Sequence, residues 1–178
     1  MEVVYERCCG LDVHKRTVVA CRITPGPGGV PEKEVRTFET MTDDLLSLSR
    51  WLSEAGVTHV AMESTGVYWK PIWNLLEEDF ELILANPRQI KARSRRKTDV
   101  HDSEWIADLL RHGLIEPSFV PGREQRELRE LTRYRTSLVQ ERSAELNRLQ
   151  KTLEGANVKL ASVASDVHGS RPARCWKG

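Results

Sequence analysis

Alternating apolar and polar positions in the first half of the chain predict a series of short strands. In the first of them, Cys9, Leu11 and Val13 would face one side of a sheet, and Asp12 the other. A two-residue link then leads into another β-branched run, which predicts a hairpin. The predicted strands are residues 3–14, 17–23, 35–40, 57–63 and 80–85.

Helical spacing of apolar residues follows the third and fourth strands. The first predicted helix begins with Thr42 as its N-cap and ends near Gly56. The second covers residues 67–78 and carries Pro71 in its first turn, where proline is tolerated. Strands in a meander, then alternating with helices, predict a mixed α/β sheet with helices on its faces.

A long, highly charged helix is predicted for residues 124–153. One seven-residue seam comprises Val139, Leu146 and Leu153; a second comprises Leu128 and Leu149, with Arg135 and Arg142 between them. Such a coiled-coil-like arm is expected to pack on another helix, and a second copy of the chain is favoured. The predicted organisation is a catalytic domain (1–120), a helical arm for dimerisation (121–160) and a tail (161–178).

Composition sets limits on the class of protein. The 178 residues are 39% hydrophobic and 30% charged, with a net charge of +1, so no global charge excess indicates a nucleic-acid partner. The four cysteines, Cys8, Cys9, Cys21 and Cys175, form no C-x-x-C pair and are expected to be buried thiols in a reducing compartment. With neither a membrane-spanning run nor a signal-peptide pattern, we expect a cytoplasmic protein that does not bind membranes.

One stretch of the chain is strongly basic. Residues 88–97 hold six basic side chains and no acid: Arg88, Lys91, Arg93, Arg95, Arg96 and Lys97. A solvated loop is one interpretation; contact with nucleic-acid phosphates is the other. The run leads directly into a helix that begins with acids.

Four carboxylates occupy positions suited to a metal site. Asp12 lies on the first strand, Glu63 ends the fourth, and Asp99 and Asp102 share one face of the helix that follows the basic run. If the two strands are neighbours, these acids can converge, and an oxygen-rich site suits Mg²⁺ or Mn²⁺. Two such ions would support phosphodiester chemistry. The competing interpretation is that Thr98 or Asp99 caps the helix and favours its dipole.

Two histidines lie close to these acids in the sequence. His14 follows Asp12 by two residues, and His101 precedes Asp102. Either can ligate a metal or contact a phosphate, and either can equally be structural.

Four motifs together carry a specific resemblance: residues 10–15 (GLDVHK), 62–66 (MESTG), 97–102 (KTDVHD) and 105–110 (WIADLL). In order and spacing they resemble the insertion-sequence transposases with an Asp-Glu-Asp-Asp tetrad, the insertion-sequence one-ten family, which is related to the pilin-gene DNA invertases. The match runs over residues 10–169. The resemblance implies an RNase H-like fold similar to the Holliday-junction resolvase RuvC, with Asp12, Glu63, Asp99 and Asp102 as the metal-binding tetrad.

The resemblance also implies partners for the chain. Members of this family recombine DNA under the guidance of a structured bridge RNA, and they act as oligomers joined partly through a helical arm. The predicted helix over residues 124–153 matches such an arm.

The sequence departs from the family at its end. Family members continue into a second domain with a nucleophilic serine, whereas Ser165 and Ser170 do not lie in that motif and residues 173–178 look foreign. We therefore expect a frameshifted, truncated transposase. The leading interpretation is the N-terminal catalytic domain of a DNA transposase; the alternatives are a non-catalytic nucleic-acid-binding or dimerising fragment and a stand-alone RuvC-like junction endonuclease.

Overall fold

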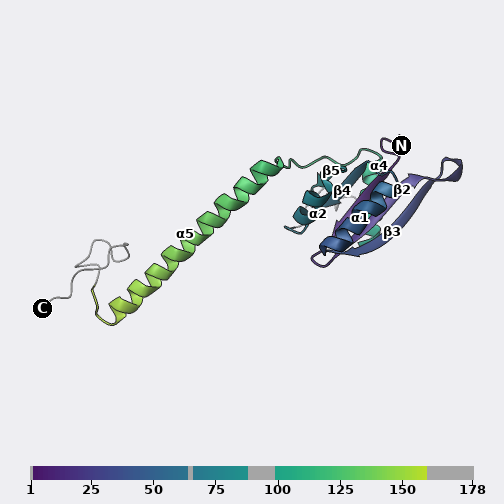
Figure 1. The fold of residues 1–178 in the computed structure, drawn as a ribbon. Coiled ribbons are helices and arrows are strands. Elements are labelled where there is room, and N and C mark those ends of the chain that lie inside the picture. The colour runs from purple at the N-terminus through teal and green to yellow at the C-terminus, as the bar shows by residue number, and fades with distance from the viewer. Residues whose placement is uncertain (1, 64–65, 88–98, 160–178) are drawn as a thin grey trace. The chain divides into compact units, whose positions relative to one another are not determined.

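The computed structural model describes residues 2–63, 66–87 and 99–159 (Figure 1), with the side chains of residues 99–101 excepted. The chain divides into two compact units, Met1–Val120 and Pro121–Gly178. The predicted tail, residues 161–178, lies outside the described residues.

A five-stranded mixed sheet forms the centre of the first unit. Its strands are β1 (Cys8–Val13), β2 (Thr17–Pro25), β3 (Pro31–Glu39), β4 (His59–Glu63) and β5 (Glu81–Ala85). They lie in the order β3-β2-β1-β4-β5, with β2 antiparallel to β1 and β3, and β4 parallel to β1 and β5. The predicted hairpin joins β1 to β2, and the backbone N–H of His14 donates to the carbonyl oxygen of Thr17 at 2.9 Å.

Helices cover both faces of this sheet (Figure 1). On one face, α1 (Thr42–Glu54) and α2 (Trp69–Leu76) pack on Cys9, Leu11 and Val13 of β1. On the other face, α4 (Asp99–Arg111) packs on the side that carries Cys8. The alternation of β1 is therefore as predicted, and the expected mixed α/β sheet flanked by helices is confirmed. Its strand order, with β2 alone reversed among the described strands, is that of an RNase H-like domain.

The two edges of the sheet differ. Beyond β5, a bridge pairs Ala85 with Pro117, and the N–H of Ser118 donates to the Leu84 carbonyl oxygen at 2.7 Å. At the other edge, β3 carries exposed charged side chains. Among its charges, Glu34 pairs with Arg22 and Arg36. Desolvation acts to raise the pKa of Glu34, but hydrogen bonds from Arg36 and Arg22 outweigh it and lower that pKa below its ordinary value.

Three predicted element starts are wrong. The first strand begins at Cys8 rather than at residue 3, because the N–H groups of Val4 and Tyr5 donate to the Arg111 carbonyl oxygen of α4, at 2.9 and 3.1 Å. Thr42 is not an N-cap: it is the first residue of α1, Met41 occupies the cap, and no side chain bonds to the cap. The third strand begins at Pro31, four residues before the predicted start at residue 35. The ends of the other elements differ from the prediction by one or two residues.

The second unit is dominated by one helix, α5 (Arg123–Gly155), of 33 residues. At 1.5 Å per residue it is about 50 Å long. None of its residues, all of which the structure describes, is buried. The predicted long helix is confirmed. Among the described residues, no helix is long and apolar enough to cross a membrane.

Candidate functional site

Asp12 and Glu63 come together at the carboxyl ends of two neighbouring parallel strands. The register between β1 and β4 pairs Gly10 with Ala61 and Leu11 with Met62, so the next residues on the two strands are Asp12 and Glu63. Because side chains alternate along a strand, both acids share the face of Gly10 and Ala61, on which α4 packs. Asp12 is 9% exposed, and Glu63 is half-buried.

Gly10 brings α4 unusually close to this face. A Cβ atom at Gly10 would lie 2.3 Å from the backbone nitrogen of Ala107 and 2.4 Å from the carbonyl oxygen of Ser103. Ser103 itself is fully buried. Only a residue without a side chain allows the helix backbone to rest directly on β1.

The direction of α4 is fixed by its contacts along β1. Near the start of the strand, the Cys8 thiol donates to the Ala107 carbonyl oxygen at 3.8 Å, and Arg111 is bonded to the residues that precede β1. Ser103 lies over Gly10, farther along the strand. The first turn of α4, with Asp99 and Asp102, therefore begins toward the end of β1 that carries Asp12.

His14 lies against the carboxylate of Asp12. Its Nε2 is 3.1 Å from Oδ2 of Asp12, and its side chain is 43% exposed. An imidazole in this position can orient the carboxylate. The functional and the structural role of His14 both stay predictions.

The full set of four predicted acids is not seen as one cluster. Among the side chains that the structure describes, no group of three or more His, Cys, Asp or Glu residues is arranged to hold a metal ion. Asp102 is half-buried in the first turn of α4, whereas the side chains of Asp99 and His101 lie outside the description. Thr98, Ser64, Thr65 and the predicted phosphate-binding residues 88–97 also lie outside the described residues.

The sequence did not lead us to predict that Gly10 sets the distance between β1 and α4. The contact between Gly10 and Ser103 was not predicted, although it fixes how β1, which carries Asp12, lies against α4, which carries Asp102. The only signal available was a glycine two residues before Asp12 in a strand otherwise made of larger residues, since such a glycine often marks a close backbone approach.

The three cysteines that the structure describes lie in environments that suppress their reactivity. Cys8, Cys9 and Cys21 are free and fully buried, as predicted, and Cys175 lies outside the described residues. Burial raises the pKa of Cys8 and of Cys21 to about 12, and that of Cys9 well above its ordinary value. Thiols of this kind stay protonated near neutral pH and are poor nucleophiles.

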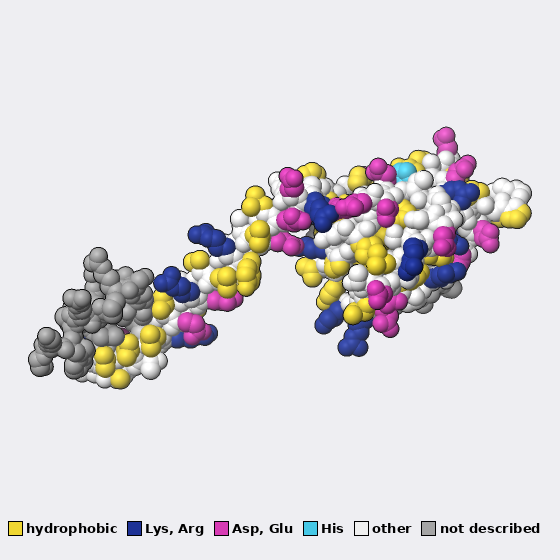
Figure 2. All heavy atoms as spheres, in the orientation of Figure 1, with side chains coloured by type: hydrophobic (Ala, Val, Ile, Leu, Met, Phe, Trp, Pro, Cys, Tyr) yellow, Lys and Arg dark blue, Asp and Glu magenta, His cyan; other side chains and the backbone are white. Residues whose placement is uncertain are grey.

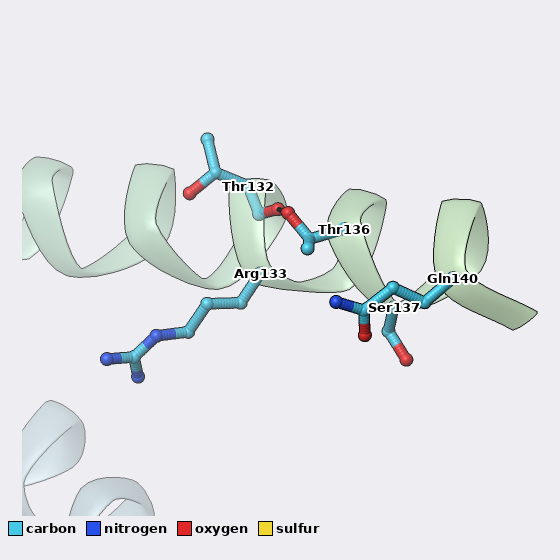
Figure 3. A pocket seen from close by; sticks show the side chains of 5 residues that line it. All are labelled: Thr132, Arg133, Thr136, Ser137 and Gln140. Atoms are coloured by element: carbon cyan, nitrogen blue, oxygen red, sulfur yellow. Dashed lines mark hydrogen bonds between the residues drawn. The ribbon is translucent and has the colours of Figure 1, made fainter.

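A shallow hollow lies on α5, in the second unit. It is lined by Thr132, Arg133, Thr136, Ser137 and Gln140 (Figure 3). The Thr136 hydroxyl donates to the Thr132 carbonyl oxygen at 2.9 Å, and that of Thr132 to Leu128 at 3.0 Å. The Ser137 hydroxyl donates to the Glu141 carboxylate at 3.0 Å. Because no acid lines the hollow and its three hydroxyls are already bonded within α5, it offers no site for a metal ion.

The fold places the first unit among RNase H-like domains, here with two acids at the ends of adjacent central strands. A family match makes the assignment specific. The model of the DEDD IS110 family, described as "Transposase", matches residues 9–158. The chain belongs to this transposase family.

Solved structures give a weaker likeness. RuvC from Thermus thermophilus is 12% identical with a TM-score of 0.45, covering 63% of this chain and 99% of that one. The Fowlpox virus resolvase, solved with substrate Holliday junction DNA, is 12% identical with a TM-score of 0.44, covering 60% of this chain and 99% of that one. No curated protein matches the chain. Identities and scores this low support no inference about what this chain binds.

Proposed function

We propose that the first unit is the metal-dependent catalytic domain of a DNA transposase, in which Asp12, Glu63, Asp99 and Asp102 bind Mg²⁺ or Mn²⁺ for phosphodiester chemistry. The observation that carries the proposal is the parallel register of β1 and β4, which makes Asp12 and Glu63 neighbours on the face covered by α4. Membership of the transposase family supports it.

The chemistry of the donors fits a hard divalent cation. Asp12 and Glu63 supply carboxylate oxygens, and the side chains of Cys8 and Cys21 on the same face are buried within the core, away from solvent. Oxygen ligands favour Mg²⁺ or Mn²⁺ over zinc. When bound, the ions would lower the pKa of an attacking water or hydroxyl and stabilise negative charge on the leaving oxygen.

The residues of the chain itself hold the acids in place. β1 is paired with β4 as far as Leu11 and with β2 through Asp12, which lies opposite Val19, so the backbone that leads into Asp12 is held from both sides. His14 contacts its carboxylate, and the contact between Gly10 and α4 sets the distance from β1 to the helix that carries Asp102. A rigid strand and a closely packed helix suit a site that must hold like charges together.

The partners follow from the same proposal. The substrate is DNA, and the basic residues Arg88, Lys91, Arg93, Arg95, Arg96 and Lys97 would contact nucleic-acid phosphates. A structured guide RNA and further copies of the chain, joined through α5, complete the assembly that membership of the family suggests.

Calorimetric titration with Mn²⁺ tests the site. Each protein is titrated alone and with a branched DNA oligonucleotide, because phosphates often complete the shell of a divalent ion. We expect wild type to bind Mn²⁺ and Asp12→Asn to lose most of this binding. Asp43→Asn is the matched control, since Asp43 is an exposed acid in the first turn of α1.

The outcomes separate clearly. Equal binding by wild type and Asp12→Asn, with urea midpoints showing both folded, would refute the tetrad. Two results together would establish the catalytic role. Mn²⁺ binding would depend on Asp12, and Mn²⁺-dependent nicking of the oligonucleotide would be abolished by Asp12→Asn.

A further inference from the structure

We propose that Lys15 and Arg16, in the turn between β1 and β2, hold a phosphate of the DNA strand beside the acids of the candidate site. The inference rests on the proposed function, because it concerns how the substrate of that site is positioned. It adds two cations to the proposed DNA contacts, and neither belongs to the basic run at residues 88–97.

The turn lies at the same edge of the sheet as the candidate site. It joins Val13, the last residue of β1, to Thr17, the first residue of β2, so it follows Asp12 closely. Lys15 is three residues beyond Asp12, and a fully extended chain of that length spans at most about 11 Å. The distance of 3.1 Å between Nε2 of His14 and Oδ2 of Asp12 shows that the chain entering the turn stays against this carboxylate. Two basic side chains therefore begin close to a proposed metal ligand.

Hydrogen bonds hold the backbone of the turn in place. The N–H of His14 donates to the Thr17 carbonyl oxygen at 2.9 Å. Thr40, which follows β3 directly, binds the other side of the turn. Its N–H donates to the Arg16 carbonyl oxygen and its hydroxyl to the Lys15 carbonyl oxygen, both at 3.1 Å. Because this backbone is already fixed, less conformational entropy is lost when the two side chains bind a ligand.

The side chains of this turn are available to bind an anion. Lys15 and Arg16 are both exposed, and among the residues that the structure describes neither side chain has a hydrogen-bond or ion-pair partner. By contrast, Lys33 of β3 pairs with Asp108 of α4 at 2.6 Å. On the face that Figure 2 shows, basic and acidic side chains are interspersed over the first unit. Two unpaired cations next to each other therefore provide a local attraction that a mixed surface does not.

Such an attraction is needed beside a cluster of acids. Asp12 and Glu63 repel the phosphates of an approaching DNA strand as long as their charge is not neutralised. Cations at the same edge of the sheet attract that strand, and contacts to phosphate act at any base sequence. Arg16 offers a planar fork for two phosphate oxygens, and Lys15 offers a compact point charge.

Binding of a branched DNA oligonucleotide over a series of salt concentrations tests the contact. Fluorescence anisotropy is measured without divalent metal, so that the candidate metal site does not contribute. The double variant Lys15→Gln/Arg16→Gln should reduce the dependence of log K on log salt by about 1.8, near 0.9 for each lost phosphate contact. The double variant Lys15→Arg/Arg16→Lys keeps both charges and should keep the wild-type dependence.

Arg50→Gln is the matched control and should leave the salt dependence unchanged. Arg50 is an exposed cation of α1, which covers the face of the sheet opposite α4. Its guanidinium bonds to Leu46 and Ser47 of its own helix.

Uncharged phosphates locate the contact on the DNA. In a set of oligonucleotides, one phosphate at a time is replaced by a methylphosphonate. At the contacted position this change should weaken binding to wild type by about tenfold. It should leave binding to Lys15→Gln/Arg16→Gln unchanged, because that variant has no cation left to lose at this phosphate. With Mn²⁺ added, the bond that wild type nicks should lie on the same strand, beside that phosphate.

The outcomes separate this proposal from the proposed metal site. Lys15→Gln/Arg16→Gln should keep the urea midpoint and the Mn²⁺ affinity of wild type without DNA, since both side chains are exposed and neither pairs with Asp12. An unchanged salt dependence, or methylphosphonate losses that are equal in wild type and variant at every position, would overturn the proposal. Equal Mn²⁺ binding by wild type and Asp12→Asn would instead refute the metal site and leave the turn as a DNA contact.

Discussion

Replacing Gly10 by alanine should displace α4 and weaken both the fold and the metal site. The added Cβ would lie 2.3 Å from the backbone nitrogen of Ala107, whereas ordinary contact begins at 3.4 Å, so the helix must retreat by about 1 Å. The obstacle is backbone at both Ala107 and Ser103, and no flexible side chain can move aside. Overpacking of this kind costs about 1–3 kcal/mol.

That cost is large enough to measure and small enough to leave the protein folded, since domains of this size are stable by about 5–15 kcal/mol. With a urea dependence of about 1–3 kcal/mol per molar, the unfolding midpoint should fall by roughly 1 M. Affinity for Mn²⁺ should fall as well, because Asp102 moves with α4 away from Asp12.

Gly155→Ala is the control, since a Cβ at Gly155 in α5 meets nothing within 4 Å. An unchanged midpoint for Gly10→Ala would refute the packing argument. A lowered midpoint with unchanged Mn²⁺ affinity would show that the contact stabilises the fold without setting the site.

Two other predictions follow from the charges and the thiols. Changing Arg93, Arg95 and Arg96 together to alanine should weaken DNA binding and reduce the dependence of log K on log salt by about 2–3, near 0.9 for each lost phosphate contact; an unchanged slope would place the contacts elsewhere. Stability against urea should fall as the pH rises from 9.0 toward 12, because unfolded thiols lose their protons near 9.0 while the buried Cys8 and Cys21, with pKa values of about 12, keep theirs. Each thiol contributes about 1.4 kcal/mol per pH unit in that window. Cys8→Ala should make the decline shallower, and an identical slope would contradict this assignment.

Periodicity predicted most of the fold because local patterns decide it. The alternation along β1 identified its two faces, and the spacing of Val139, Leu146 and Leu153 identified a long helix. The start of β1 could not be read in this way. Val4 and Tyr5 look like strand residues, but their N–H groups bond to the end of α4, a partner far away in the sequence.

The candidate site was predictable only in part. Placing Asp12 beside Glu63 required the assumption that the first and fourth strands are neighbours, and their parallel pairing confirms that assumption. The close approach of α4 depends on the absence of a side chain at Gly10; a glycine within a strand indicates such an approach, but it does not identify which helix makes it. His14 was ambiguous in sequence, because its contact with Asp12 depends on how the chain turns after β1.

The two edges of the sheet have a consequence for how this protein can be handled in solution. An unpaired strand edge invites strand addition by another molecule, which is the first step of fibre growth. Here the β5 side is closed in part by Pro117 and Ser118, and the β3 side presents Glu32, Lys33 and Arg36. Charged edges of this kind repel an incoming strand. Concentrated samples should therefore self-associate through the exposed apolar side chains of α5, such as Leu128, Leu131 and Tyr134, and not through the sheet. Substitutions that make this helix more polar should raise solubility without altering the first unit.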